Sequence, residues 1–206
     1  MLWLPSLLGE GLGERAAMTR TFLALELPDA VRNTLRRLLE RLAQMIPEVR
    51  WVDSAGLHVT LAFLGELDDM QLEAATQTAL TVASLHAPFS LRLAGLDTFG
   101  SARSPRVIWE GLAGEKARLL ALQAAVVDDL AARGFPREDR PFSPHLTLAR
   151  IKKPLTDDAL ATLARVQHEP PPDASWRADA ISVMKSELLR PAARYTALSR
   201  WPLAQP

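Results

Sequence analysis

Two short segments of this sequence carry the same pattern of residues that can do chemistry. Residues 58–61 read His-Val-Thr-Leu, and residues 145–148 read His-Leu-Thr-Leu, 87 residues further on. On a β-strand alternate side chains share a face, so each imidazole lies beside a threonine hydroxyl while the apolar neighbours point into the core. The chain has only four histidines, and two of them occupy this pattern. The repetition predicts a catalytic surface rather than two isolated structural histidines.

The repeated pattern suits acid–base chemistry on a phosphate ester. Histidine titrates near neutral pH, so one imidazole can take a proton while a second donates a proton in the same reaction. Threonine hydroxyls can donate hydrogen bonds to phosphate oxygens without adding charge. A phosphodiester is therefore the natural substrate, with one histidine activating the attacking oxygen and the opposite histidine protonating the leaving oxygen.

The elements that would carry these residues occur twice in the same order. Apolar periodicity and turn residues predict strand, helix, strand, helix, strand in each half of the chain. In the first half the strands are predicted at 21–27, 57–64 and 89–96, and the helices at 29–45 and 68–85. In the second half the strands are predicted at 106–112, 145–151, 174–189 and 195–203, and the helices at 115–132 and 156–167. Any α/β chain alternates in this way, but the motifs recur at nearly the offset of the halves, which favours a duplication into two similar lobes.

Composition narrows the classes of function. The 206 residues include no cysteine, which excludes thiolate nucleophiles and iron–sulfur clusters and fits a cytoplasmic protein. Lys plus Arg equals Asp plus Glu at 24 each, which argues against a broad basic face for long nucleic acid but leaves room for a small phosphate pocket. No segment is apolar for long enough to predict a membrane span. Residues 1–17 are interpreted as a flexible extension or a misplaced start, and 18–206 as one bilobal domain.

The sequence resembles the 2H phosphoesterase superfamily, which is named for two His-x-Thr-x motifs. Within it the sequence is similar to the LigT-like RNA 2′,3′-cyclic phosphodiesterases, also called 2′-5′ RNA ligases. The resemblance runs from about Arg20 to Leu203 through the blocks FLALELP, LHVTLAFLGEL, RVIW, RPFSPHLTLAR and RYTALSRWPL. It implies an α+β fold of two lobes, each with an antiparallel sheet and flanking helices, around a central cleft. It also implies metal-independent opening of RNA 2′,3′-cyclic phosphates to 2′-phosphates, with reverse 2′-5′ ligation as a secondary activity.

The resemblance also implies roles for single residues. His58 would be the proton donor to the departing 3′-oxygen, and His145 the proton acceptor that activates water. Thr60 and Thr147 would hold the non-bridging oxygens. Arg150 would pair with the phosphate, although an arginine at a strand end is more often part of a surface ion pair. No metal and no cofactor is expected, and the expected partners of a monomeric protein are RNA 3′ ends or small 2′,3′-cyclic nucleotides.

Three further residues are candidates for a nucleoside pocket. Phe63 either packs in the core, which is the preferred interpretation, or turns outward to stack on a base. Phe142 and Ser143 lie in the loop that enters the second motif and can line the pocket. Trp109 and Tyr195 are interpreted as packing residues of their strands.

Two classes of function are compatible with these residues. The first is a cyclic phosphodiesterase, and the alternative is a non-catalytic module that binds a nucleotide or an RNA end in the same cleft. Binding alone does not require an intact acid–base pair, so the repeated histidines favour the enzyme.

Overall fold

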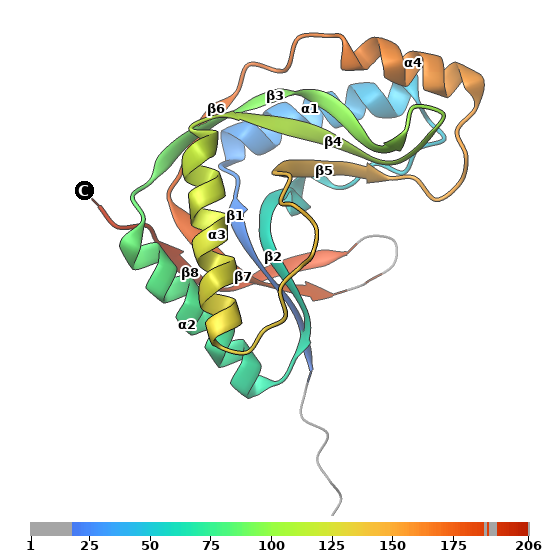
Figure 1. Cartoon of the computed structure of the whole chain (residues 1–206). Coiled ribbons are helices and arrows are strands. Elements are labelled where there is room, and N and C mark those ends of the chain that lie inside the picture. The colour runs from blue at the N-terminus through green and yellow to red at the C-terminus, as the bar shows by residue number, and fades with distance from the viewer. Residues whose placement is uncertain (1–17, 188, 190–192, 206) are drawn as a thin grey trace, which may run out of the picture.

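The computed structural model describes residues 18–187, 189 and 193–205, so the extension predicted for residues 1–17 lies outside the described residues. Figure 1 shows four α-helices beside two twisted sheets. The strands are β1 (Thr19–Glu26), β2 (His58–Leu67), β3 (Phe89–Ser101), β4 (Ser104–Gly114), β5 (His145–Arg150), β6 (Ser175–Ala178), β7 (Ala180–Glu187) and β8 (Arg194–Pro202). The helices are α1 (Asp29–Met45), α2 (Asp69–Leu85), α3 (Lys116–Ala132) and α4 (Asp157–Gln167), with a 3₁₀ turn at Ser54–Gly56.

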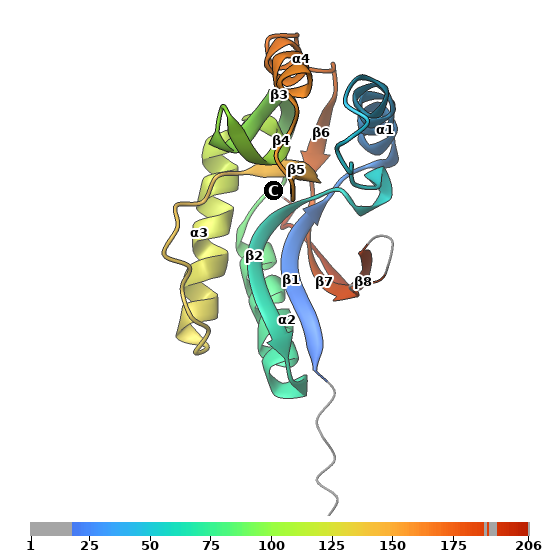
Figure 2. The same cartoon turned by 90° about the vertical axis from the view of Figure 1, so that its right-hand side faces the viewer.

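The strands form two antiparallel sheets built on the same plan. Their strand orders are β2-β1-β7-β8 and β5-β4-β3-β6. In each sheet a motif strand, β2 or β5, lies at one edge and pairs with the strand before it in the chain, β1 or β4. The two motif strands contact each other where the sheets meet, in the middle of Figure 2. The α+β, bilobal and duplicated fold predicted from the sequence is confirmed.

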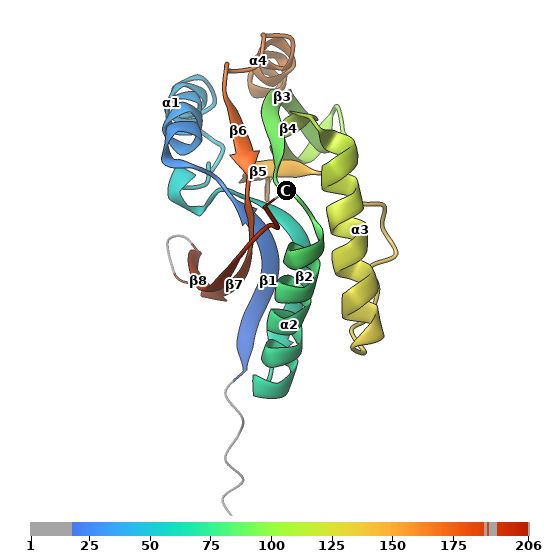
Figure 3. The ribbon, with the colours of Figure 1, turned by 90° about the vertical axis from the view of Figure 1, so that its left-hand side faces the viewer.

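Neither sheet is built from one half of the chain. Strand β3 ends the first half but pairs with β4 in the second sheet, and β7 returns to the first sheet beside β1. Helix α3 follows β4 but packs against α2 and β2, as Figure 3 shows. Helix α1 follows β1 but lies beside β3 and β4 of the second sheet. Its Arg41 forms an ion pair at 2.7 Å with Glu169, which comes just after α4. These crossings tie the two lobes together, and with them the two motif strands.

The single strand predicted for residues 174–189 is wrong, because this segment forms two strands that belong to different sheets. Asp179 separates β6 from β7. Its side chain accepts a hydrogen bond from Arg200 at 2.8 Å, and its carbonyl accepts one from the Leu203 amide at 2.8 Å. Aspartate is disfavoured within strands, and this corner satisfies its polar groups. The break carries the chain from the second sheet back to the first.

The helices use their apolar faces to build the core between these layers. Helix α1 buries one stripe of residues spaced by three and four, namely Val31, Leu35, Leu38, Leu39 and Leu42. Helix α2 begins at a capping box, in which Asp68 accepts a hydrogen bond from the Gln71 amide and the Gln71 side chain accepts one in return. None of the helices in the described ranges has the length and apolar content needed to cross a bilayer.

Candidate active site

The two motif strands face a single cavity. His58, Thr60, His145 and Thr147 all line it, and its volume is about 800 Å³. This volume lies toward the upper end of the range of typical ligand sites. Strands β2 and β5 contact each other as edge strands of different sheets, so each contributes its histidine and threonine from its own side. The fold therefore brings the four predicted residues together across 87 residues of chain.

A β-bulge follows the threonine in both motif strands, at Leu61 in β2 and at Leu148 in β5. Both leucines are buried. Each bulge carbonyl accepts a hydrogen bond from outside its own sheet pairing. Gln123 Nε2 of α3 donates to Leu61 at 3.3 Å, and the Val52 amide donates to Leu148 at 2.9 Å. A bulge increases the local twist and re-aims the side chains beside it, so the shared irregularity belongs to the geometry of the motif.

The imidazole of His58 is enclosed by aromatic rings. Phe22 of β1 stacks on it with a centroid distance of 4.5 Å, and Tyr195 of β8 meets it edge-on at 5.0 Å. His58 Nδ1 lies 2.7 Å from the carbonyl oxygen of Gly56, which places the proton of the neutral ring on Nδ1 and leaves Nε2 for proton transfer. Glu26 stands directly opposite His58 in the pairing of β1 with β2. The first imidazole therefore has two aromatic neighbours and one carboxylate.

His145 repeats the backbone contact of His58 with different neighbours. Its Nδ1 lies 2.7 Å from the carbonyl oxygen of Ser143, and its Nε2 lies 3.2 Å from Thr147 Oγ1. Phe99 and Trp109 meet the ring edge-on, with centroid distances of 5.0 and 6.0 Å. The backbone contact again directs Nδ1 to a carbonyl, so Nε2 is the nitrogen that lies beside the threonine hydroxyl.

The environment lowers the pKa of both imidazoles. For His58 burial is the largest cause of the lowered pKa, and the nearby charge of His145 adds to it, whereas a backbone hydrogen bond and the charge of Glu26 oppose it. For His145 burial again lowers the pKa most, a backbone hydrogen bond opposes this, and the positive charge of Arg150 lowers it further. The neighbouring side-chain charges therefore act in opposite directions. Glu26 favours the protonated form of His58, and Arg150 favours the neutral form of His145.

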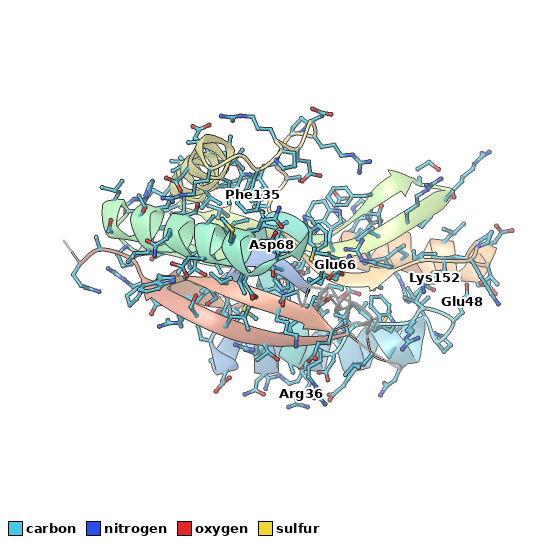
Figure 4. The ribbon with its side chains drawn as sticks, turned by 90° about the horizontal axis from the view of Figure 1, so that it is seen from below. Arg36, Glu48, Glu66, Asp68, Phe135 and Lys152 are labelled. Atoms are coloured by element: carbon cyan, nitrogen blue, oxygen red, sulfur yellow. The ribbon has the colours of Figure 1, made fainter. Side chains whose placement is uncertain are left out.

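A strip of chain extends the wall of the cavity beyond β5. Trp51 forms a bridge with Ala149, and the segment 48–53 thereby lies along the free edge of β5. Glu48, at the start of this strip, and Lys152, after the end of β5, both line the cavity and are labelled near each other in Figure 4. The cationic side chains that line the cavity are Arg50, Arg150, Lys152 and Lys153. Arg150 thus lies in the cavity, and its role as a phosphate ligand stays a prediction.

The three nucleoside-pocket candidates are not among the residues that line this cavity. Phe63 is 51% exposed, so the preferred interpretation as a core residue is wrong. The irregular pairing of β1 with β2 on either side of Phe63 leaves its ring at the surface, where Arg20 lies 4.6 Å above the ring centroid. Phe142 packs against the core, and Ser143 supplies the carbonyl that orients His145. A role for these three residues in substrate binding stays a prediction.

Two aromatic residues of the cavity were not predicted from the sequence. Tyr195 was interpreted as a packing residue, but it lines the cavity and contacts His58. Trp51 also lines the cavity, through the strip that pairs with β5. Strand β8 is exposed at most positions, so its side-chain pattern gives little sign of which residues face a ligand. The contact of Tyr195 with His58 joins residues far apart in the chain, so local sequence patterns do not reveal it.

Known proteins that are similar to this chain belong to one group of phosphodiesterases and RNA ligases. A family model described as the 2′-5′ RNA ligase superfamily matches residues 27–189. An RNA 2′,3′-cyclic phosphodiesterase of Geobacillus stearothermophilus is 35% identical over 145 residues, which are 69% of this chain and 46% of that protein. A protein of the same name from Methanothermobacter thermautotrophicus is 29% identical over 178 residues, which are 86% of this chain and 95% of that protein. The chain therefore spans less than half the length of the first relative and nearly all of the second.

Solved structures extend the similarity to the whole fold. E. coli LigT complexed with 3′-AMP superimposes with a TM-score of 0.73 at 30% identity, covering 91% of this chain and 99% of that chain. The apo form of E. coli LigT gives a TM-score of 0.74 at 28% identity, covering 92% of this chain and all of that chain. E. coli LigT has also been solved in complexes with NADP+ and with ATP. The arrangement of the two sheets in this chain is thus shared with a protein that binds nucleotides.

Proposed function

This chain belongs to the 2′-5′ RNA ligase superfamily, and we propose that it hydrolyses RNA 2′,3′-cyclic phosphodiester ends to 2′-phosphate ends. The observation that carries the proposal is the pair of His-x-Thr strands that face one cavity. The activity named for the two curated relatives and the nucleotides bound by E. coli LigT support the same reaction and substrate class.

The proposed reaction uses one imidazole as base and the other as acid. Neutral His145 accepts a proton from water through Nε2 while the water oxygen attacks phosphorus. The bond from phosphorus to the 3′-oxygen breaks on the opposite side, and protonated His58 donates its proton to that oxygen. The products are a 3′-hydroxyl and a 2′-phosphate, with His145 protonated and His58 neutral. Proton exchange with solvent then restores both residues.

The remaining motif residues are proposed to hold the phosphate. Thr60 and Thr147 donate hydrogen bonds to its non-bridging oxygens, and Arg150 supplies a planar, charged donor at the edge of the same cavity. The phosphate is anionic, so these contacts orient it for attack in line with the 3′-oxygen. Replacing water by the 5′-hydroxyl of a second RNA gives the reverse 2′-5′ ligation, which we propose as a secondary activity.

The charges beside the two histidines support this assignment of acid and base. Glu26 raises the pKa of His58, which favours the protonated acid, and Arg150 lowers the pKa of His145, which favours the neutral base. The two motifs themselves are nearly identical, so they do not distinguish the roles. The distinction comes from residues outside the motifs.

The proposal is tested by incubating the protein with an oligoribonucleotide that ends in a 2′,3′-cyclic phosphate, in the presence of EDTA. Conversion to a 2′-phosphate end, mapped by its resistance to a 3′-specific phosphatase activity, is the expected result. Turnover that persists at the wild-type rate after both His58→Ala and His145→Ala would contradict the proposal. Tight binding of a nucleotide without any product would instead support the alternative of a non-catalytic binding module. A monomeric state and a cytoplasmic location stay predictions.

A further inference from the structure

The cavity contains more positive charge than one phosphate requires. Its cationic side chains are Arg50, Arg150, Lys152 and Lys153. In the part of the chain that the structure describes, none of these four lies within ion-pair distance of a carboxylate, whereas Arg41 and Arg133, on the outer helices, are both paired at 2.7 Å or less. The unpaired cations are therefore available to an anionic ligand.

The carboxylates that line the cavity are engaged in local structure. Glu48 accepts hydrogen bonds from the Thr156 amide at 2.8 Å and from the Thr156 hydroxyl at 3.1 Å. Asp53 accepts a hydrogen bond from the Ala55 amide at 2.9 Å and caps the 3₁₀ turn. Neither is paired with a cation of the cavity. The four cations outnumber the two carboxylates, so the cavity carries a net positive charge in a chain whose formal net charge is zero.

The cations lie on two neighbouring segments of chain, the end of β5 with its following loop and the strip beside β5. Arg150 ends strand β5, five residues after His145, and Lys152 and Lys153 follow in the loop toward α4. Arg50 lies on the strip that is paired with the free edge of β5. Figure 4 labels Lys152 beside Glu48, the first residue of this strip, and both residues line the cavity. A ligand held at the two histidines can therefore extend along these two segments.

We infer that Arg50, Lys152 and Lys153 form a second phosphate subsite, which binds the internucleotide phosphate next to the cyclic end of an RNA strand. The inference rests on the proposed function and makes it more specific, since it predicts a preference for oligoribonucleotide ends over free 2′,3′-cyclic mononucleotides. The site recognises one additional phosphate group and does not need a broad basic face, which agrees with the neutral charge of the chain.

The inference is tested with two substrates, 2′,3′-cyclic AMP and the dinucleotide ApA with a 2′,3′-cyclic phosphate. The quantity measured is the ratio of kcat/KM for the dinucleotide to kcat/KM for the mononucleotide. We expect a ratio well above one in the wild-type protein and a fall of about tenfold in the Lys152→Gln/Lys153→Gln variant, because each exposed ionic contact contributes up to about fivefold. Lys116→Gln removes the same charge from an exposed lysine at the start of α3, outside the cavity, and serves as the matched control.

A chemical change in the substrate isolates the contact itself. Replacing the internucleotide phosphate of the dinucleotide by a neutral methylphosphonate should lower the wild-type ratio about as much as the lysine substitutions do. In the lysine variant the same replacement should lower the ratio by clearly less than it does in the wild-type protein, since of the three proposed contacts only that of Arg50 remains. A ratio that stays within twofold of the wild-type value in the lysine variant, or with the methylphosphonate, overturns the inference. Absence of hydrolysis of either substrate by the wild-type protein would instead overturn the proposed function.

Discussion

The two motif strands share a backbone design but have different surroundings. Both place a histidine and a threonine in the cavity, both direct histidine Nδ1 to a backbone carbonyl, and both bulge after the threonine. The position opposite the histidine on the neighbouring strand is Glu26 in the first sheet and Gly111 in the second. A duplicated framework therefore fixes the geometry, and residues outside the motifs make the two imidazoles unequal.

The glycine in the second sheet has a packing reason. A Cβ atom on Gly111 would lie 3.4 Å from the ring of Trp109 and 3.3 Å from the carbonyl oxygen of Gly95. Trp109 also packs beside His145, so a side chain at position 111 would meet both this ring and the backbone of Gly95. In the first sheet Phe22 and Tyr195 pack on His58, and the residue opposite this histidine is Glu26. The position opposite His145 is therefore tightly packed, whereas the position opposite His58 carries Glu26.

The largest expected loss of activity comes from removing either histidine, and a modified substrate distinguishes the acid, His58, from the base, His145. His58→Ala and His145→Ala should each lower kcat/KM by about 10²- to 10⁴-fold on a normal cyclic phosphate. If the 3′-oxygen is replaced by sulfur, the leaving thiolate needs no proton, because a thiol has a pKa of about 8.5. The loss caused by His58→Ala should then become small, while the loss caused by His145→Ala persists. If the sulfur substrate instead reduces the loss caused by His145→Ala, His145 is the acid and His58 the base. His168→Ala, at the end of α4, is the control.

The next effect compares equivalent positions five residues after each histidine, Arg150 and Phe63. Arg150→Gln removes a charged phosphate contact and should lower kcat/KM by about tenfold to a hundredfold. Phe63→Leu should change it by less than twofold, because Phe63 does not line the cavity. Steady-state kinetics of both variants on one substrate measures the difference. Equal losses would show that the two strands contribute alike.

The pH dependence of kcat/KM should reveal the different charges beside the two histidines, Glu26 near His58 and Arg150 near His145. Both imidazoles have pKa values lowered by burial, and activity requires one neutral and one protonated, so the maximum of kcat/KM should lie below about pH 6.5. Arg150→Gln removes a charge that lowers the pKa of His145, so the rising limb, where the base loses its proton, should move to higher pH. Glu26→Gln removes a charge that raises the pKa of His58, so the falling limb, where the acid loses its proton, should move to lower pH. If neither limb of the pH profile moves in these variants, Glu26 and Arg150 do not set the pKa values of the two histidines.

A smaller effect concerns the aromatic cover of His58. Tyr195→Leu removes the ring that meets the imidazole edge-on and should increase its exposure to water. Because burial is the main cause of the lowered pKa of His58, the pKa should rise toward its ordinary value. The change can be followed by NMR titration of the imidazole, together with a loss of kcat/KM of a few fold. A pKa of His58 that stays the same would show that Tyr195 does not shield it.

The smallest expected effect is on stability, and it concerns the hydrogen bonds to the β-bulges at Leu61 and Leu148. Gln123→Leu leaves the carbonyl of Leu61 without its side-chain donor and should lower the free energy of unfolding by about 1 kcal/mol, with little change in kcat. In the other motif strand the donor to Leu148 is the Val52 amide, which only Val52→Pro removes. That variant should lose more stability, because proline also restricts the backbone of the strip along β5. Urea denaturation of the two variants gives the comparison.

Local patterns in the sequence predict some elements of this fold closely. The helices at 29–45 and 68–85 are found within a residue of their predicted ends, since apolar spacing and capping residues are local signals. Local patterns do not predict the change of sheet at Asp179 or the irregular pairing that leaves the ring of Phe63 at the surface. Both depend on partners far away in the chain. The same holds for Tyr195 and for the strip at 48–53, whose places in the cavity are set by long-range packing.

The amino-acid sequence is enough to predict two equal His-x-Thr strands, because strand periodicity puts each histidine and threonine on one face. It also determined the family and the chemistry that the two pairs support. The meeting of the two strands at one cavity depends on long-range packing, since β3 and β7 cross between the lobes and hold the sheets together. The tertiary structure also placed Glu26 beside one imidazole and Arg150 beside the other. Electrostatic interactions depend on distance in space, so the inequality of the two histidines could not be derived from their motifs.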